Sequence, residues 1–175
     1  MKKIISIILV ALMILCFASC GNDTGDGTTE APSESIPAST TVRDDSFIHG
    51  DLVLNIGEAI SESTLAPLGE PLDKQSAPSC HYDGNDTIYI YDGLVIYTYA
   101  DGDNEVVYLI EITSDAYSAK NNTKVGMTID EVKNAFGEPA TETTVSIVYN
   151  LSDTTAIRFT VADSTVTMIE YEEVI

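Results

Sequence analysis

Few residues in this chain have the types and spacing that catalysis requires. Cys80 and His81 are the one place where a cysteine stands next to a histidine, and a thiol nucleophile needs a base within hydrogen-bond reach. Adjacent side chains of a strand point to opposite faces, so these two groups would not meet. The sequence also lacks a phosphate-binding loop, a serine nucleophile elbow and a zinc-type spacing of cysteines. We therefore expect a protein that is not an enzyme.

The segment 101–105, Asp-Gly-Asp-Asn-Glu, alternates oxygen ligands as the start of a calcium-binding EF-hand loop does. Such a loop needs Gly at its sixth position and a bidentate Glu at its twelfth, where this chain has Val106 and Ile112. The two histidines, His49 and His81, are too few for a metal triad. The sequence predicts a tight hairpin loop here, with weak calcium binding as the alternative, and neither a resident metal nor a cofactor.

Acidic residues dominate the charge of the chain. It has 28 Asp and Glu against 8 Lys and Arg, which gives a formal net charge of −20 at pH 7. Such a surface repels nucleic acid and anionic lipid, and it favours either simple solubility or a cationic partner. We therefore expect no nucleic-acid partner, and contact with a membrane only through a lipid anchor.

The N-terminus is typical of an export signal. Two lysines precede the apolar run 4–17, which has the length of a secretory signal core and is short for a membrane span. Residues 17–20, Phe-Ala-Ser-Cys, resemble the lipobox of bacterial lipoprotein signals. The resemblance implies a signal peptide over 1–19 and lipidation of Cys20, with palmitate-type chains that hold an exported protein on the extracytoplasmic face of a membrane. The alternative is an ordinary signal peptide with an incidental cysteine.

Residues 20–45 are predicted to form a flexible tether. They consist mainly of Gly, Thr, Ser, Ala, Pro and acids, a composition that cannot bury enough apolar surface to fold. A tether of this length has a root-mean-square reach of roughly 30 Å. The folded part, expected from Ser46 onward, then holds Cys80 as its single cysteine, so it has no internal disulfide and depends on a hydrophobic core.

The clearest structural signal is a helix between Gly126 and Pro139. Thr128 and Glu131 have the spacing of a capping box, and Gly137 permits a positive φ after the last turn. A helix of about two turns is not stable alone and must pack on something else.

The remaining segments alternate apolar and polar residues, which predicts strands. The expected strands span residues 87–91, 94–99, 106–112, 144–150, 156–161 and 165–171. Between the first two, Asp92-Gly93 is the favoured two-residue hairpin turn, which would pair residue 90 with 95 and residue 88 with 97. A shorter helix is expected after Ser61 or Ser63, where Pro67 limits it to little more than one turn.

Four landmarks recur in the same order in the two halves of this region. The matched segments are 56–57 with 125–126, 68–71 with 136–139, 97–101 with 159–163, and 110–111 with 169–170. A duplication of this kind predicts an α+β fold of two tandem repeats, residues 46–118 and 119–175. Each repeat would be a short helical segment packed on an antiparallel sheet of three to four strands.

The repeat also predicts which face of the first sheet looks outward. If Tyr97 corresponds to Phe159, the side chains of residues 88, 90, 95, 97 and 99 point to the core. The outward face then carries the candidate partner-binding residues Tyr89, Tyr91, Leu94, Ile96 and Tyr108. A contiguous apolar and aromatic patch of this kind is typical of a protein-binding surface.

The pattern Val-Gly-Met-Thr…Gly-x-Pro of residues 125–139, ahead of antiparallel strands in a lipoprotein, resembles the SmpA/OmlA-type outer-membrane lipoprotein module. Its tandem form is similar to the β-lactamase inhibitory protein family. That resemblance implies paired sheets with a concave binding face. In the inhibitors, an acidic loop residue ahead of an aromatic strand enters the active site of the enzyme, and Asp86 is the position here that fits this pattern.

These features together favour a surface-anchored, non-catalytic lipoprotein whose sheet face binds a protein partner in the cell envelope. Two alternatives stay open. One is a structural envelope lipoprotein with no exposed binding patch, and the other is an inhibitor or sensor of a secreted enzyme such as a β-lactamase.

Overall fold

The computed structural model describes residues 41–174. The expected signal peptide, the lipidated Cys20 and the tether up to residue 40 lie outside the described residues. The strands are β1 (Phe47–His49), β2 (Leu52–Leu54), β3 (Ala59–Ile60), β4 (Asp73–Pro78), β5 (Asn85–Tyr91), β6 (Leu94–Asp101), β7 (Asn104–Ile112), β8 (Thr141–Glu142), β9 (Ser146–Asn150), β10 (Thr155–Ala162) and β11 (Thr165–Glu173). The helices are α1 (Glu62–Leu65) and α2 (Ile129–Phe136), with 3-10 turns at Ala66–Leu68 and Lys120–Asn122. Neither described helix is long and apolar enough to cross a membrane.

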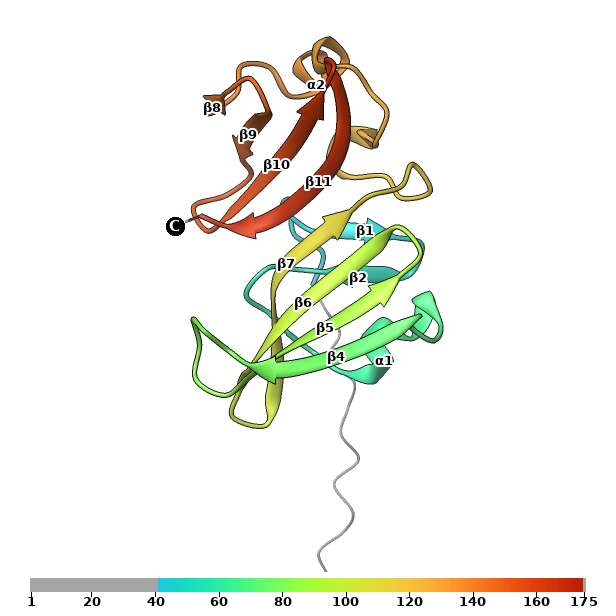
Figure 1. Cartoon of the computed structure of the whole chain (residues 1–175), viewed down its shortest axis with the longest axis vertical. Helices are drawn as coiled ribbons and strands as arrows, with labels where there is room; N and C mark the ends of the chain where they lie inside the picture. Colours follow the sequence, from blue (N-terminus) through green and yellow to red (C-terminus); the bar gives the residue numbers. More distant parts are fainter. Residues whose placement is uncertain (1–40, 175) are drawn as a thin grey trace, which may run out of the picture. The chain divides into compact units, whose positions relative to one another are not determined.

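One antiparallel sheet dominates the described residues. Eight strands follow the order β4-β5-β6-β7-β11-β10-β9-β8, β3 pairs with β7 as a ninth, and β1 and β2 form a separate two-stranded sheet. Figure 1 shows β1 and β2 behind the part of the large sheet that β5, β6 and β7 form. The structure is therefore mostly β, and the expected α+β fold of two tandem helix-on-sheet repeats is wrong.

The pairing of β7 with β11 explains why the two halves are not separate units. Leu109–Ile112 pair with Ile169–Glu172, so both halves contribute strands to one hydrogen-bonded sheet. The first half also contains the hairpin of β1 and β2, and the described elements of the second half include no such hairpin. The recurring landmarks correspond to similar local structure in the two halves. Gly57 and Gly126, for example, both have a positive φ and both donate their N–H to a strand carbonyl at 2.8 Å.

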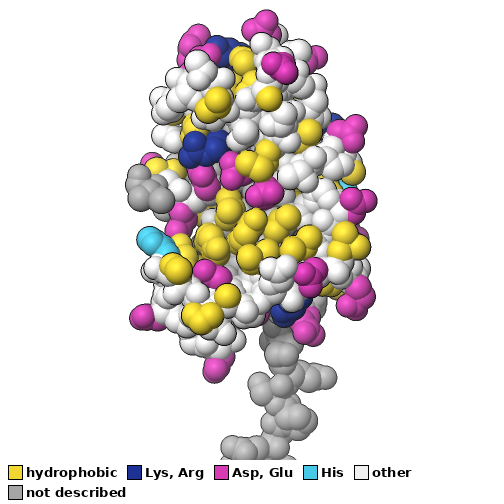
Figure 2. Space-filling view, viewed as in Figure 1, with side chains coloured by type: hydrophobic (Ala, Val, Ile, Leu, Met, Phe, Trp, Pro, Cys, Tyr) yellow, Lys and Arg dark blue, Asp and Glu magenta, His cyan; other side chains and the backbone are white. Residues whose placement is uncertain are grey.

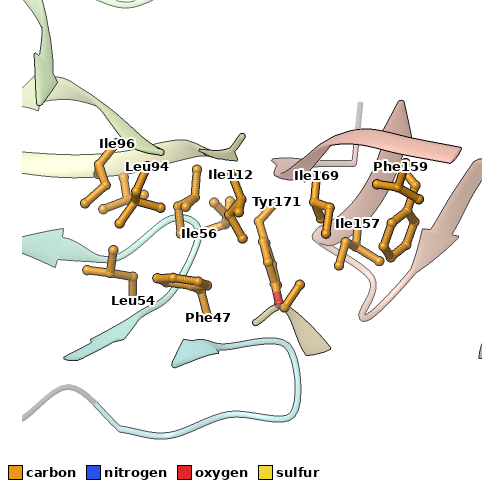
Figure 3. Close-up of a cluster of buried hydrophobic side chains, with 14 of the residues drawn as sticks. Phe47, Leu54, Ile56, Leu94, Ile96, Ile112, Ile157, Phe159, Ile169 and Tyr171 are labelled. Carbon is orange, nitrogen blue, oxygen red and sulfur yellow. The ribbon is translucent and has the colours of Figure 1, made fainter. Parts of the chain in front are cut away.

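A single hydrophobic core lies on one face of this sheet. Figure 3 shows its side chains in a continuous row, from Ile96 through Ile112 and Tyr171 to Phe159. The ring of Phe47 in β1 packs edge-on against Tyr171 with 5.9 Å between ring centroids. The ring of Phe136 in α2 covers the other end of the core, with 5.5 Å between its centroid and that of the Phe159 ring. The small hairpin and the helices thus cover one face of the large sheet.

The local predictions for the longer helix are confirmed. Thr128 is the N-cap of α2: the N–H of Glu131 donates to its hydroxyl at 3.3 Å, and its own N–H donates to the Glu131 carboxylate at 2.8 Å. The Thr128 N–H and the Thr128 hydroxyl both donate to the Glu131 carboxylate, and these two hydrogen bonds lower the pKa of that carboxyl. Gly137 follows the helix with φ 84°. The helix after Ser61 is one turn long, as Pro67 predicts.

The hairpin at Asp92-Gly93 is also confirmed. Ile90 pairs with Val95 and Ile88 with Tyr97, in the register expected from a two-residue turn. Gly93 has φ +79°, and a Cβ there would lie 2.3 Å from the Cβ of Ser114, so no other residue fits without rearrangement.

Because the core is continuous, we expect one cooperative unfolding transition. Ile96→Val and Ile157→Val each remove one buried methyl group, from β6 in the first half and β10 in the second, and should each lower the free energy of unfolding by about 1 kcal/mol. Both should shift the same transition in urea, followed by tyrosine fluorescence and by far-ultraviolet circular dichroism. Ile48→Val, at a side chain that is 46% exposed, is the control and should leave the midpoint unchanged. Two transitions that each respond to one variant would contradict a single core.

Loss of the helix cap should cost measurable stability. Thr128→Ala removes the acceptor for the N–H of Glu131 and should lower the free energy of unfolding by about 1 kcal/mol in urea titrations. Thr144→Ala, at an exposed position before β9, is the matched control and should change it by much less. Equal effects of the two substitutions would mean that the capping hydrogen bonds contribute nothing in solution.

Candidate functional site

The large sheet leaves an apolar and aromatic surface on the face opposite the core. We call this surface the open-face patch. It consists of Ile88 and Ile90 of β5, Val95, Tyr97 and Tyr99 of β6, and Tyr108 and Leu109 of β7, all of them partly exposed. Figure 2 shows hydrophobic side chains gathered in the middle of this face, with acidic side chains around them. The arrangement has the form of a binding surface, with an apolar centre and a charged border.

Four of the candidate residues from the sequence lie on the other face. Tyr89 and Tyr91 are 7% exposed, and Leu94 and Ile96 are fully buried in the core. The orientation expected from the repeat is therefore inverted. Side chains alternate along a strand, so an offset of one residue between the two halves moves every side chain to the wrong face.

The other two candidates, Tyr108 and Asp86, do lie on the open face. Tyr108 is part of the patch, with its ring centroid 6.1 Å from that of Tyr97. Asp86 belongs to β5 and not to a loop, it is partly buried, and its Oδ1 atom has no hydrogen-bond partner among the described residues.

One end of the patch is a cluster of tyrosines that the sequence did not reveal. Tyr82, from the loop between β4 and β5, stacks on Tyr99 with 3.7 Å between centroids and lies 5.5 Å from Tyr108. Its hydroxyl donates to the Glu173 carboxylate at 3.1 Å. Burial and the nearby charge of Glu173 raise the pKa of Tyr82 to about 12, so this hydroxyl stays protonated at neutral pH.

A pocket of about 280 Å³ opens beside these rings. Its walls are His81, Tyr82, Asp86, Tyr108, Leu109, Glu172 and Glu173. We call it the aromatic–acidic pocket. The loop between β4 and β5 supplies its first two residues, β5 and β7 supply the middle three, and the C-terminal end of β11 supplies the last two.

Carboxylates border the patch on the side of β11. Arg158 of β10 pairs with Glu172 at 2.5 Å and lies 3.9 Å from Glu170. Burial and the neighbouring Glu172 raise the pKa of Glu170, and Glu111 acts in the same direction. Glu111 in turn accepts a hydrogen bond from the Tyr97 hydroxyl at 3.3 Å. Among the described residues, Arg158 is the one arginine that pairs with these carboxylates. The border of the patch therefore keeps a negative charge and attracts cations.

Segment 101–105 is a tight hairpin, since Asp101 pairs with Asn104, and Glu105 turns away to accept a hydrogen bond from Tyr89. Within residues 41–174, no group of three or more His, Cys, Asp or Glu residues could hold a metal ion. Cys80 is a free and exposed cysteine.

No family model, curated protein or solved structure matches this chain. The geometry of the open face alone points to a site. That geometry places an apolar patch, a negative border and a pocket on the same side of one sheet. An arrangement of this kind is suited to binding.

Two tyrosines on adjacent strands test which face is buried. Tyr89→Ser should lower the free energy of unfolding by roughly 3 kcal/mol, because it empties a core position and removes the donor to Glu105. Tyr97→Ser, on the open face, should lower it by about 1 kcal/mol or less. The measurement is urea denaturation of both variants under the same conditions. Equal or reversed effects would place the core on the other face.

Proposed function

We propose that this protein is a non-catalytic docking module whose open-face patch binds another protein. The observation that carries the proposal is the continuity of the patch: its apolar and aromatic side chains lie on three adjacent strands and are all partly exposed. Single exposed apolar residues are common on soluble proteins, whereas contiguous patches usually mark binding surfaces. Tyrosine also suits such a surface, since it combines a large apolar ring with a hydroxyl that can hydrogen-bond.

The chemistry of the border indicates what kind of partner fits. A partner with an apolar centre and lysine or arginine residues at its edge would complement the patch and its carboxylates. A second copy of this chain is a poor fit, because two chains that each carry a net charge of −20 would bring acidic borders together. The proposed partner is therefore a different, cationic protein.

The proposed location follows from the N-terminal residues. With an export signal and a lipid on Cys20, the module would be held on the extracytoplasmic face of a membrane, on a tether that lets the open face reach its surroundings. The partner would then be an envelope protein or a secreted protein. The open face requires no cofactor for binding of this kind.

Position-specific crosslinking in intact cells tests the proposal. A photoreactive phenylalanine analogue at position 95, in the middle of the patch, should capture one cationic protein. The same analogue at Val145, which is exposed but lies outside the patch, is the control and should not capture it. Capture from both positions, or from neither, would contradict the proposal.

The captured protein then allows a quantitative test. The double variant Ile90→Ser and Val95→Ser should weaken binding at least tenfold in calorimetry, because it removes apolar contact area at the centre of the patch. The exposed Leu72 and Val145 provide a matched control, as Leu72→Ser with Val145→Ser should leave the affinity unchanged. Raising the salt concentration from 0.05 M to 0.5 M should slow association through screening of the acidic border. Binding that is unchanged both by the patch variant and by the salt concentration would exclude the open-face patch as the binding surface.

A further inference from the structure

The aromatic–acidic pocket contains hydrogen-bond acceptors that the described residues do not use. Asp86 Oδ1 is buried without a partner, and Tyr108 has its pKa raised by burial and by the nearby charge of Asp86. Glu173 accepts a hydrogen bond from Tyr82, but within residues 41–174 it takes part in no ion pair. Carboxylates of two different strands therefore line the pocket: Glu173 keeps exposed acceptor capacity, and Asp86 contributes its negative charge.

The basic residues of the described region are engaged elsewhere. Arg43 pairs with Asp45 and Glu58, Lys74 with Glu105, Lys120 with Asp44, Lys133 with Glu142, and Arg158 with Glu170 and Glu172, while Lys124 donates to the carbonyl of Asp115. Of these, only Arg158 approaches a residue that lines the pocket, namely Glu172. The described residues thus supply no cation to Asp86 or Glu173.

The walls add two flat aromatic surfaces to these carboxylates. Tyr82 is held in place by its stack on Tyr99, with an angle of 9° between the ring planes. Tyr108 lies at 50° to Tyr82, so the two rings form a corner beside the acceptors. Aromatic rings attract cations through their negative faces, and a carboxylate next to the ring strengthens that attraction.

We propose that the aromatic–acidic pocket binds an arginine side chain of the protein partner. The guanidinium group is planar, so it can stack on a tyrosine ring, and its five N–H donors can reach acceptors on two sides at once. A lysine ammonium group is a compact and strongly hydrated charge that makes less use of a flat wall. This inference rests on the proposed function, because it names the group by which the partner is recognised.

The pocket can be tested without the partner. N-acetyl-arginine amide is the probe, and the ring signals of the tyrosines in nuclear magnetic resonance spectra of the full chain are the readout. We expect saturable shifts of the Tyr82 and Tyr108 signals with a dissociation constant on the order of 1 mM, typical of a single small group. The citrulline amide has the same shape without the charge, and it should bind at least tenfold more weakly. The lysine amide should bind several-fold more weakly.

Matched variants distinguish binding in the pocket from attraction to the negative charge of the protein as a whole. Asp86→Asn with Glu173→Gln should weaken binding of the arginine amide at least tenfold. Asp51→Asn with Glu138→Gln removes the same charge from exposed positions that do not line the pocket, and it should leave binding unchanged. Thermal midpoints of both variants establish that they are folded. Equal weakening by both pairs would show diffuse attraction and overturn the proposal, as would equal affinity for the arginine, lysine and citrulline amides.

The titration with the arginine amide and the crosslinking at position 95 give separate results for the arginine site and for the docking function. If the amide binds in the pocket but crosslinking at position 95 captures nothing, the arginine site stands and the proposed docking function fails. If a partner binds the open-face patch with an affinity that Asp86→Asn with Glu173→Gln leaves unchanged, and the amide also fails to bind, the docking function stands and the arginine site fails.

Discussion

Hydrogen bonds between β7 and β11 join strands from the two halves of the chain into one sheet, and the remaining structure depends on this junction. Because the sheet is continuous, its inward side chains form one core in which Ile112 and Tyr171 lie between Leu94 and Phe159 (Figure 3). The elements that cover this core are short: the hairpin of β1 and β2, with three residues in each strand, and the helices α1 and α2. They cover one face, so the side chains of the opposite face stay in contact with solvent.

The open face changes character from one side to the other. On β5 and β6 its side chains are aliphatic and aromatic, whereas on β10 and β11 they include Arg158, Glu170 and Glu172. The boundary runs along β7, where Tyr108 and Leu109 belong to the patch and Glu111 belongs to the charged border. A surface with apolar and charged regions side by side offers a partner both buried area and a preferred orientation, which a uniformly apolar patch would not.

The sequence predicted much of the local structure and misplaced the site. The hairpin at Asp92-Gly93 and the capped helix α2 follow from turn and capping chemistry that acts over a few residues. Strand β4 has no such signal, because it is an exposed edge strand of polar residues. The open face was inverted because the repeat matched Tyr97 with Phe159, whose side chain points to the core, an offset of one residue. A bulge between Tyr97 and Thr98 pairs Val95 with Glu111, where an uninterrupted ladder from the next turn would pair it with Ile110. A ladder without this bulge would set the outward Glu111 opposite Leu94, and would therefore wrongly assign Leu94 and Ile96 to the open face as well.

By itself, the sequence determined the net charge and the elements with strong caps and turns, because these depend on residue type and short spacing. Only the tertiary structure decided that the strands form one sheet and not two, and which face of it is covered. Both depend on long-range pairing, in which a shift of one residue exchanges the two faces. The aromatic–acidic pocket belongs to this second group, because Tyr82, Asp86, Tyr108 and Glu173 come together only when β7 and β11 are neighbours in the sheet.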